Sequence, residues 1–195
     1  MIKNFYIFRH GQSSYNVEGR IQGHTNNSVL TETGIEQARR AGQLLTGKNI
    51  EIIISSPLNR AKQTGSIVSE AIRTPIRFDD RFTEVNVGVV EGMHYTKVQE
   101  QYGELYKQWR SSDPRYADIS FDKGETKRQV RTRIFAALND YAANSSYTNI
   151  AISGHGITLS QTLTALGVEI PEIPNGAIIH LQNDNGTWKF VGFVN

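Results

Sequence analysis

The sequence predicts an α/β fold, a three-layer α/β/α arrangement around a mainly parallel, mixed central sheet. Short apolar runs alternate with amphipathic helical patterns along the 195 residues, which is typical of parallel strands joined by helices. Near the end of the chain, two such runs flank Asp184-Asn185-Gly186, a strong hairpin signal that adds antiparallel pairing at one side. The length fits a single domain over 1–195, with a small helical cap insertion at about 93–121.

Strands are predicted where short runs of bulky apolar residues suit burial on both faces of a sheet. These runs cover 5–8, 52–54, 76–78, 149–153, 178–181 and 189–193. Apolar stripes at helical spacing predict helices over about 31–46, from Pro57 onward, over 125–143 and from about 156 onward. The stretches 12–30 and 79–92 are expected as loops, and 94–121 as one or two short helices followed by an irregular loop.

Composition excludes several classes of protein. The chain is 38% hydrophobic and 21% charged, as in ordinary globular domains, and its net charge of +2 does not suggest a nucleic-acid partner. The absence of cysteine excludes a disulfide scaffold, a thiolate nucleophile and a Cys-ligated metal. No signal peptide and no run near the roughly 20 apolar residues of a membrane span is present, so no membrane association and a cytoplasmic location are expected.

Two of the predicted strands end directly at a histidine flanked by glycine. Residues 5–8 lead into Arg9-His10-Gly11, and residues 150–153 lead into Gly154-His155-Gly156. Glycine lets the chain turn sharply and lets backbone N–H groups approach a ligand. Ligands of an open parallel sheet bind outside the carboxyl ends of its strands, and neighbouring strands lie about 4.8 Å apart. The two histidines are therefore expected to face one crevice.

Basic groups beside these histidines suggest that the crevice binds an anion. A guanidinium such as Arg9 forks onto phosphate oxygens, and a neutral imidazole can attack phosphorus and hold the phosphoryl group covalently. Arg60 follows another predicted strand, and His155 opens a helix whose N-terminal amides favour an anion. Each of these features also has a purely structural interpretation. Arg9-His10 could form surface hydrogen bonds, Arg60 could be a solvated arginine in a first helical turn, and His155 could be a helix N-cap.

The sequence also offers candidates for an acidic catalytic residue and for a metal site. Glu84 is one of several loop acids, and its own chemistry does not distinguish it from Asp79, Asp80 or Glu91. His10, His155 and a carboxylate could form a two-His-one-acid metal set. No HxxxH, HExxH or HxH spacing supports that set, and the arginines would repel a cation. We therefore expect neither a metal nor a cofactor.

With these residues in view, the sequence resembles the histidine phosphatase superfamily, the phosphoglycerate-mutase-like group, over nearly the whole chain. Six blocks occur in the order of the family pattern, and the first of them is an Arg-His-Gly signature. The blocks are Phe8-Arg9-His10-Gly11-Gln12-Ser13-Ser14-Tyr15-Asn16, Gln22-Gly23 with residues 30–38, residues 55–64, Glu84 with Gly88 and Glu91-Gly92, Gly124-Glu125-Thr126, and Ser153-Gly154-His155-Gly156.

The resemblance implies a fold of the expected class and a catalytic role for five residues. His10 would be the nucleophile that forms a phosphohistidine, and Arg9, Arg60 and His155 would bind the transferring phosphoryl group. Glu84 would protonate the leaving oxygen and then activate water. The arginines and a helix N-terminus would supply positive charge without a metal. The substrate-binding residues implied by the same blocks are Ser13, Asn16, Gln22, Gly23 and Gly156.

Two departures from the family pattern bear on function. Residues 86–90 lack the acid and the aromatic residue that commonly follow the family's glutamate. The span from Glu84 to Gly124 is shorter than the insertion of phosphoglycerate mutases, has no clear equivalent of their basic motif, and is followed by no long tail. The leading expectation is thus a metal-independent phosphomonoesterase for a small phosphorylated metabolite. A cofactor-dependent phosphoglycerate mutase and a non-catalytic phospho-ligand binding protein are the alternatives, and a homodimer is left open.

Overall fold

The computed structural model describes residues 2–169 and 172–195, which contain one six-stranded mixed sheet. The strand order is β3-β2-β4-β1-β5-β6. Strands β1 to β4 pair in parallel, whereas β5 pairs antiparallel with both β1 and β6. The strands are β1 (Ile2–Arg9), β2 (Ile52–Ser55), β3 (Ile76–Phe78), β4 (Asn149–Gly154), β5 (Ile178–Asp184) and β6 (Thr187–Val194).

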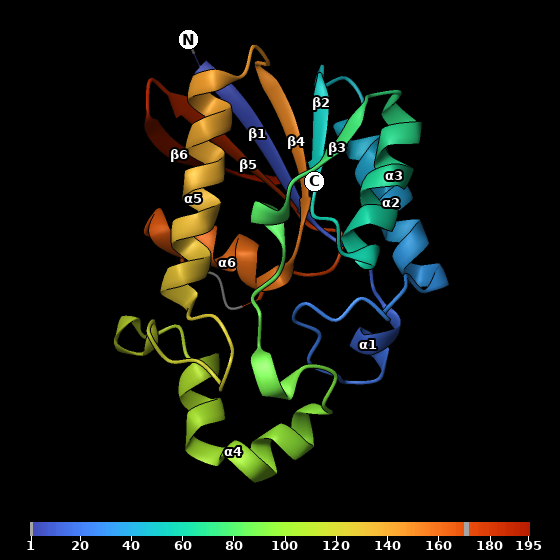
Figure 1. The fold of residues 1–195 in the computed structure, drawn as a ribbon. Coiled ribbons are helices and arrows are strands. Elements are labelled where there is room, and N and C mark those ends of the chain that lie inside the picture. Colours follow the sequence, from blue (N-terminus) through green and yellow to red (C-terminus); the bar gives the residue numbers. More distant parts are fainter. Residues whose placement is uncertain (1, 170–171) are drawn as a thin grey trace.

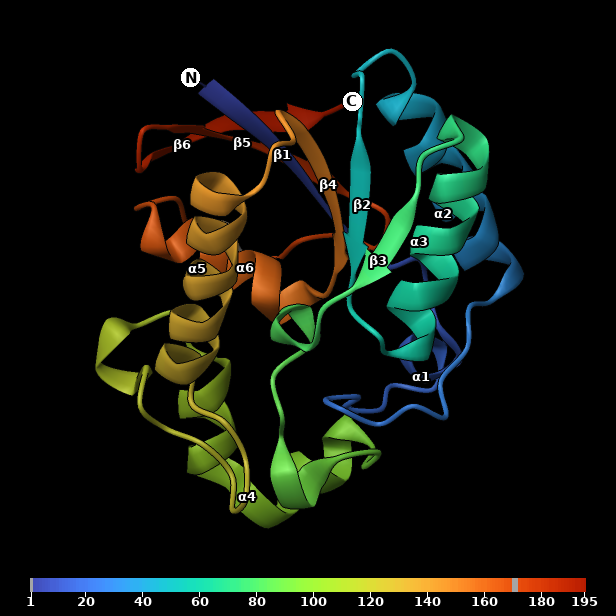
Figure 2. The ribbon, with the colours of Figure 1, turned by 45° about the horizontal axis from the view of Figure 1, so that its top comes forward.

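Helices cover both faces of this sheet, as Figures 1 and 2 show. Helices α2 (Glu32–Leu45) and α3 (Asn59–Ile72) lie on one face, and α5 (Lys127–Asn144) and α6 (Gly156–Ala165) lie on the other. The predicted three-layer α/β/α class with a mainly parallel, mixed sheet is therefore confirmed.

The strand sequences are continuous apolar runs because both faces of the sheet are covered by helices. Phe5 and Ile7 pack into the larger core cluster, which contains the buried residues of α5 and α6. Tyr6 and Phe8 point to the other face, into the cluster with α2 and α3. Because successive side chains of a strand point to opposite faces, a sheet covered on both faces needs an apolar residue at nearly every position.

The remaining elements gather beyond the carboxyl ends of the parallel strands. They are α1 (Ser14–Val17), η1 (Asp80–Phe82), η2 (Gly88–Val90), α4 (Tyr95–Arg110) and η3 (Pro114–Tyr116). Helix α4, drawn in green in Figure 1, bends at Gly103, whose φ of 34° is not helical. The ring of Phe121 packs between those of Tyr102 and Trp109, with centroids 5.3 and 5.4 Å away. Trp109 and Phe121 belong to the larger core cluster, so aromatic packing joins the segment predicted as a cap to the core of the domain.

The structure differs from the sequence expectations at two places. Helix α3 begins at Asn59 rather than at Pro57, because Leu58 has extended φ and ψ and its amide donates to Ser56 Oγ. The stretch 12–30, expected as a loop, contains the short helix α1, with Ser13 as its N-cap. Within the described residues, no helix has the length and apolar character needed to cross a bilayer.

Candidate active site

The two glycine-flanked histidines meet at the carboxyl ends of neighbouring strands. β1 and β4 are hydrogen-bonded in parallel, and Arg9 lies opposite Gly154 in their register. The next residue of each strand is the histidine, and the ring centroids of His10 and His155 lie 5.3 Å apart. The two rings are therefore in contact, as expected; His10 lines the crevice, whereas His155 is fully buried directly behind it.

A single hydrogen bond orients the His10 ring. Its Nδ1 lies 2.7 Å from the carbonyl oxygen of Gly11. A carbonyl only accepts, so Nδ1 carries the hydrogen and the unprotonated Nε2 keeps its lone pair. Burial, followed by the charges of Arg60 and Arg9, holds the pKa of His10 well below its usual value, and the bond to Gly11 only partly opposes this. At neutral pH the ring is therefore uncharged, as a nucleophile must be.

Close packing explains the glycine after His10. A Cβ on Gly11 would lie 2.2 Å from the carbonyl oxygen of Gly34, in the first turn of α2. The backbone at Gly11 does not have a positive φ. Glycine is thus needed here for close approach to α2 and not for the sharp turn that the sequence suggested.

His155 is fully buried and has one ring nitrogen without a partner. Its Nε2 lies 2.7 Å from Ser56 Oγ, whereas Nδ1 is buried with no hydrogen-bond partner. Burial, the charge of Arg60 and the adjacent His10 hold its pKa well below the usual value, with smaller effects of the other arginines. His155 is also the N-cap of α6, as the structural alternative predicted.

Two guanidinium groups enter the same crevice. Arg60 is 1% exposed and donates to the carbonyl oxygens of Gly23 and Thr25 at 2.7 and 3.0 Å. Burial lowers the pKa of Arg60 to about 10, so the group remains charged at neutral pH. Arg9 donates to the carbonyl oxygen of Ile173. The Nε of each arginine is buried without a partner, which is costly unless a ligand anion accepts its hydrogen.

The start of α6 completes this positive region. A Cβ on Gly156 would lie 3.3 Å from Arg9 Nε, so glycine lets the guanidinium lie close to the helix end. The amides of Ile157 and Thr158 donate to the carboxylate of Glu84 at 3.0 and 3.1 Å. The Gly156 amide has no acceptor among the described residues. It is therefore available to an anion at the positive end of the helix.

Glu84 is the loop acid that reaches the crevice. It is 8% exposed, and its Oε1 also accepts from the amide of Val85 at 3.0 Å. Burial lowers the pKa of both Arg9 and Arg60, and the negative charge of nearby Glu84 partly opposes this lowering. Asp79 instead pairs with Arg81, and Glu91 accepts from the His24 amide, so these two acids are engaged elsewhere.

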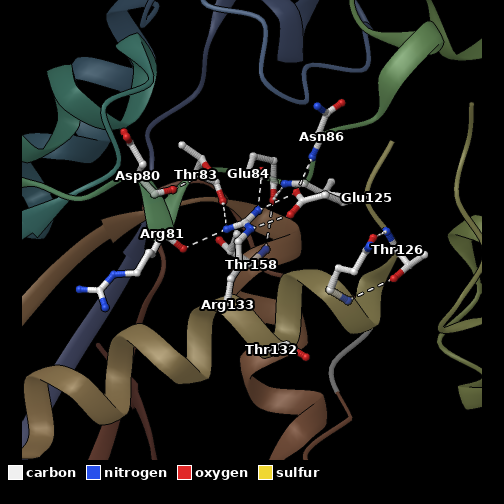
Figure 3. A network of polar contacts seen from close by, with 12 residues as sticks. Asp80, Arg81, Thr83, Glu84, Asn86, Glu125, Thr126, Thr132, Arg133 and Thr158 are labelled. Atoms are coloured by element: carbon white, nitrogen blue, oxygen red, sulfur yellow. Dashed lines mark hydrogen bonds and ion pairs between the residues drawn. The ribbon is translucent and has the colours of Figure 1, made fainter. Parts of the chain in front are cut away.

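A polar network holds the segment that carries Glu84 (Figure 3). Arg133 of α5 donates to the main-chain carbonyls of Arg81, Thr83 and Glu84 at 2.8 to 2.9 Å. The same guanidinium forms an ion pair with Glu125, with N–O distances of 2.8 and 2.9 Å. Glu125 Oε2 in turn accepts from the amide of Asn86. One partly buried cation thus fixes the path of the chain on both sides of Glu84.

The expected substrate-binding residues of the first loops fall into two groups. Asn16, Gln22 and Gly23 line the crevice. Ser13 does not line it; its hydroxyl lies 2.9 Å from Asn16 Oδ1 and 3.0 Å from Gln22 Oε1. The geometry therefore gives Ser13 a supporting place behind Asn16 and Gln22 in place of the direct contact that we expected, because its side chain is consumed by the capping of α1.

The crevice is a cavity of about 660 Å³, which is enough for a small metabolite. His10, Arg9, Arg60 and Glu84 form its floor, and residues of α4 form the opposite wall. That wall consists of Tyr95, Gln99, Tyr106, Trp109 and Arg110. Within 2–169 and 172–195, no group of three or more histidine and carboxylate side chains is arranged to hold a metal ion.

Comparison with known proteins decides the family. The sequence pattern of the histidine phosphatase superfamily (branch 1) matches residues 5–195. The chain belongs to this superfamily. The resemblance of its six motif blocks is thereby confirmed, and the expectation of a histidine phosphatase is confirmed at the level of the superfamily.

Relatives within the superfamily carry both phosphatase and mutase names. The chain is 32% identical to "Putative phosphoserine phosphatase 2" of Hydrogenobacter thermophilus, over 97% of this chain and 95% of that protein. It is 31% identical to "Probable phosphoglycerate mutase GpmB" of Proteus mirabilis, over 97% and 89%. A mycobacterial glucosyl-3-phosphoglycerate phosphatase in complex with VO3 has the same fold, with a TM-score of 0.88 over 98% of each chain at 22% identity.

Sequence reasoning missed the groups that support the site from behind. Ser56, beside His155, and Arg133, behind Glu84, lie far from their partners in the sequence. Lys127 also escaped notice. A cation in the first turn of a helix opposes the helix dipole, but the sequence does not indicate that this lysine is buried.

Proposed function

We propose that this histidine phosphatase is a metal-independent phosphomonoesterase that acts through a phosphohistidine on His10. The observation that carries this proposal is the hydrogen bond from His10 Nδ1 to Gly11 O, which leaves Nε2 as a neutral nucleophile in the crevice. Around it, the buried Nε–H groups of Arg9 and Arg60 and the Nδ1 of His155 have no protein partner. Unpaired donors beside the nucleophile are what a transferring phosphoryl group requires.

In the first step, His10 Nε2 attacks phosphorus and a P–N bond forms as the P–O bond to the leaving group breaks. Arg9, Arg60, His155 and the Gly156 amide bind the equatorial oxygens, where negative charge collects. The carboxyl group of Glu84 gives its proton to the leaving oxygen, which departs as an alcohol. Glu84 lies beside Arg9 and Arg60 and is fixed by the amides at the start of α6, which supports this assignment.

In the second step, water attacks the phosphohistidine. Glu84 takes a proton from that water, the P–N bond breaks, and inorganic phosphate leaves with His10 restored. Arginines and a helix N-terminus supply the positive charge for both steps, so the chemistry does not call for a metal.

We further propose that residues 93–121 act as a cap over a single domain and that the substrate is a small phosphorylated metabolite. The cap wall of the cavity contains Tyr95, which is 47% exposed, so water can reach the mouth of the site. An accessible mouth favours hydrolysis over phosphate return to a bound product. The mutase reading remains the second candidate, because a relative of similar identity carries that name.

The test is a phosphoenzyme experiment with a ³²P-labelled monoester in the presence of EDTA. We expect phosphate release to persist after chelation and an acid quench to destroy the label, whereas an alkaline quench preserves it on the protein. His10→Ala should abolish the label. Vanadate, which adopts the five-coordinate geometry of the transition state, should inhibit release.

Three outcomes would separate the alternatives. Labelling that survives in His10→Ala would remove His10 from its role. A strict requirement for an added divalent metal would overturn the metal-independent mechanism. A protein that binds phosphoesters but never becomes labelled would be a binding protein of the same fold.

A further inference from the structure

A second cavity of about 260 Å³ adjoins the phosphoryl crevice, and two of its lining residues, Lys127 and Gln161, have no part in the chemistry described above. Both cavities are lined by the same six residues, which are Arg9, Glu84, Trp109, Arg110, Ile157 and Glu172. The second extends over α6 toward the end of α4 and the start of α5, elements that lie on the same side of the sheet in Figures 1 and 2. A group attached to a phosphoester at His10 can therefore extend into it.

Lys127 lies in this second cavity as a buried cation without an acidic partner. It is 9% exposed, and its ammonium donates only to the carbonyl oxygen of Ser111, which leaves donor capacity unused. Burial, together with the charges of Arg110 and Arg131, lowers the pKa of Lys127 to about 8. Among the described residues, none of these three cations has a carboxylate within ion-pair distance. Lys127 is also the first residue of α5, where the helix dipole disfavours a positive charge.

A glutamine on the opposite wall is oriented as a donor. Arg131 Nη2 donates to Gln161 Oε1 at 2.9 Å, so the amide oxygen is occupied and the –NH₂ group of Gln161 remains for the cavity. Gln161 is 7% exposed and makes no other hydrogen bond among the described residues. Arg131 Nε is itself buried without a partner. Arg131 does not line the cavity, so the donors that the cavity offers are the ammonium of Lys127 and the –NH₂ group of Gln161.

Acids near the second cavity do not neutralise it. The carboxylate oxygens of Glu84 are taken by the amides of Val85, Ile157 and Thr158. Glu172 is exposed, and its charge acts on Arg9. Leaving the buried Lys127 unpaired costs free energy, and an anionic ligand group would offset that cost.

We propose that this second cavity binds a carboxylate of the substrate, with Lys127 and Gln161 as donors and Arg110 between the two cavities. The enzyme would then prefer phosphomonoesters that carry a carboxylate over otherwise similar uncharged esters. A carboxylate fits better than a bulky group because it is small and planar and offers two acceptor oxygens to the two donors that line this cavity. This inference rests on the proposed function for its substrate class, since the phosphoryl group is assigned to the His10 crevice.

The experiment compares 3-phosphoglycerate with glycerol 3-phosphate, which carries a hydroxymethyl group in place of the carboxylate. We expect wild-type kcat/KM for phosphate release to be at least tenfold higher for the carboxylate ester, which is the usual size of a hydrogen bond to a charged group. In Lys127→Gln this ratio should fall toward one. Lys107→Gln is the matched control, because Lys107 is exposed, pairs with Glu104 and lines neither cavity.

A binding measurement separates this inference from the proposed function. Calorimetric titration of both esters into wild-type protein and into His10→Ala requires no turnover, so it remains decisive if no ester is hydrolysed. Tighter binding of 3-phosphoglycerate that disappears in Lys127→Gln supports the carboxylate site. Equal binding of the two esters, or a preference that survives in Lys127→Gln, overturns it. If Lys127→Gln does not fold, Arg110→Gln takes its place with the same expectations.

Discussion

Arg133 Nη2 donates to the main-chain carbonyl of Glu84 at 2.8 Å, across 49 positions of sequence. The same guanidinium bonds Glu125 and two further carbonyls of the Glu84 segment. We infer that Arg133 positions the proposed general acid without touching substrate. Its removal would leave several acceptors and one carboxylate unpaired, so the segment would lose its fixed path.

We predict that Arg133→Met lowers the hydrolysis of an alkyl phosphate by about tenfold or more, because small misplacements of a catalytic group are costly. The hydrolysis of p-nitrophenyl phosphate should fall much less, since its leaving group needs little protonation. Arg81→Met is the matched control, because the Arg81 side chain pairs with Asp79 and Asp140 instead. An equal loss on both esters would indicate a merely structural role for Arg133.

Arg60 should act on the transition state more than on bound substrate. We predict that Arg60→Ala lowers kcat by on the order of 10²–10³, as the loss of one preorganised donor does in other enzymes. Arg60→Lys keeps the charge but loses the Nε–H, and should recover only part of the rate. Steady-state kinetics on one ester decides the point: a change confined to KM would mean uniform binding.

The buried histidines should make stability depend on pH in the mildly acidic range. His10 and His155 have pKa values well below 6.5 in the folded protein, whereas both titrate near 6.5 when unfolded. Below that pH the unfolded chain binds more protons, so stability is complete above about 6.5 and is lost as pH falls toward the folded pKa values. Each histidine contributes up to about 1.4 kcal/mol per pH unit in this window.

Urea unfolding in phosphate-free buffer between pH 7.5 and 5 checks this expectation. The free energy of unfolding of His155→Gln should fall less steeply with decreasing pH than that of the wild type. Parallel curves for the two proteins would show that His155 is not held neutral by the fold.

The rates of hydrolysis and of phosphoglycerate isomerisation can be compared on one preparation of enzyme. With 3-phosphoglycerate and a supply of 2,3-bisphosphoglycerate, we predict phosphate release with negligible formation of 2-phosphoglycerate. The physical reason is the accessible mouth beside Tyr95, which admits water to the phosphohistidine. Isomerisation faster than release would favour the mutase reading and would show that residues 93–121 close the site.

The local sequence was sufficient to predict the three layers of the fold and the two histidines at the centre of the site. Runs such as residues 5–8 are apolar at every position because both faces of their strand are covered, so local pattern was sufficient to place them. His10 and His155 each follow such a strand directly, and parallel strands end at one edge. Their meeting could therefore be derived from local sequence.

The choice between candidate site residues of the same type required the contacts between distant segments of the folded chain. Glu84 is a better candidate for the general acid than Asp79 or Glu91, because the α6 amides and Arg133 hold its segment at the crevice. Lys127 became notable only when α4 and α6 were seen to bury it. These assignments depend on contacts between distant segments, and neither periodicity nor spacing encodes such contacts, because they arise from how whole elements pack.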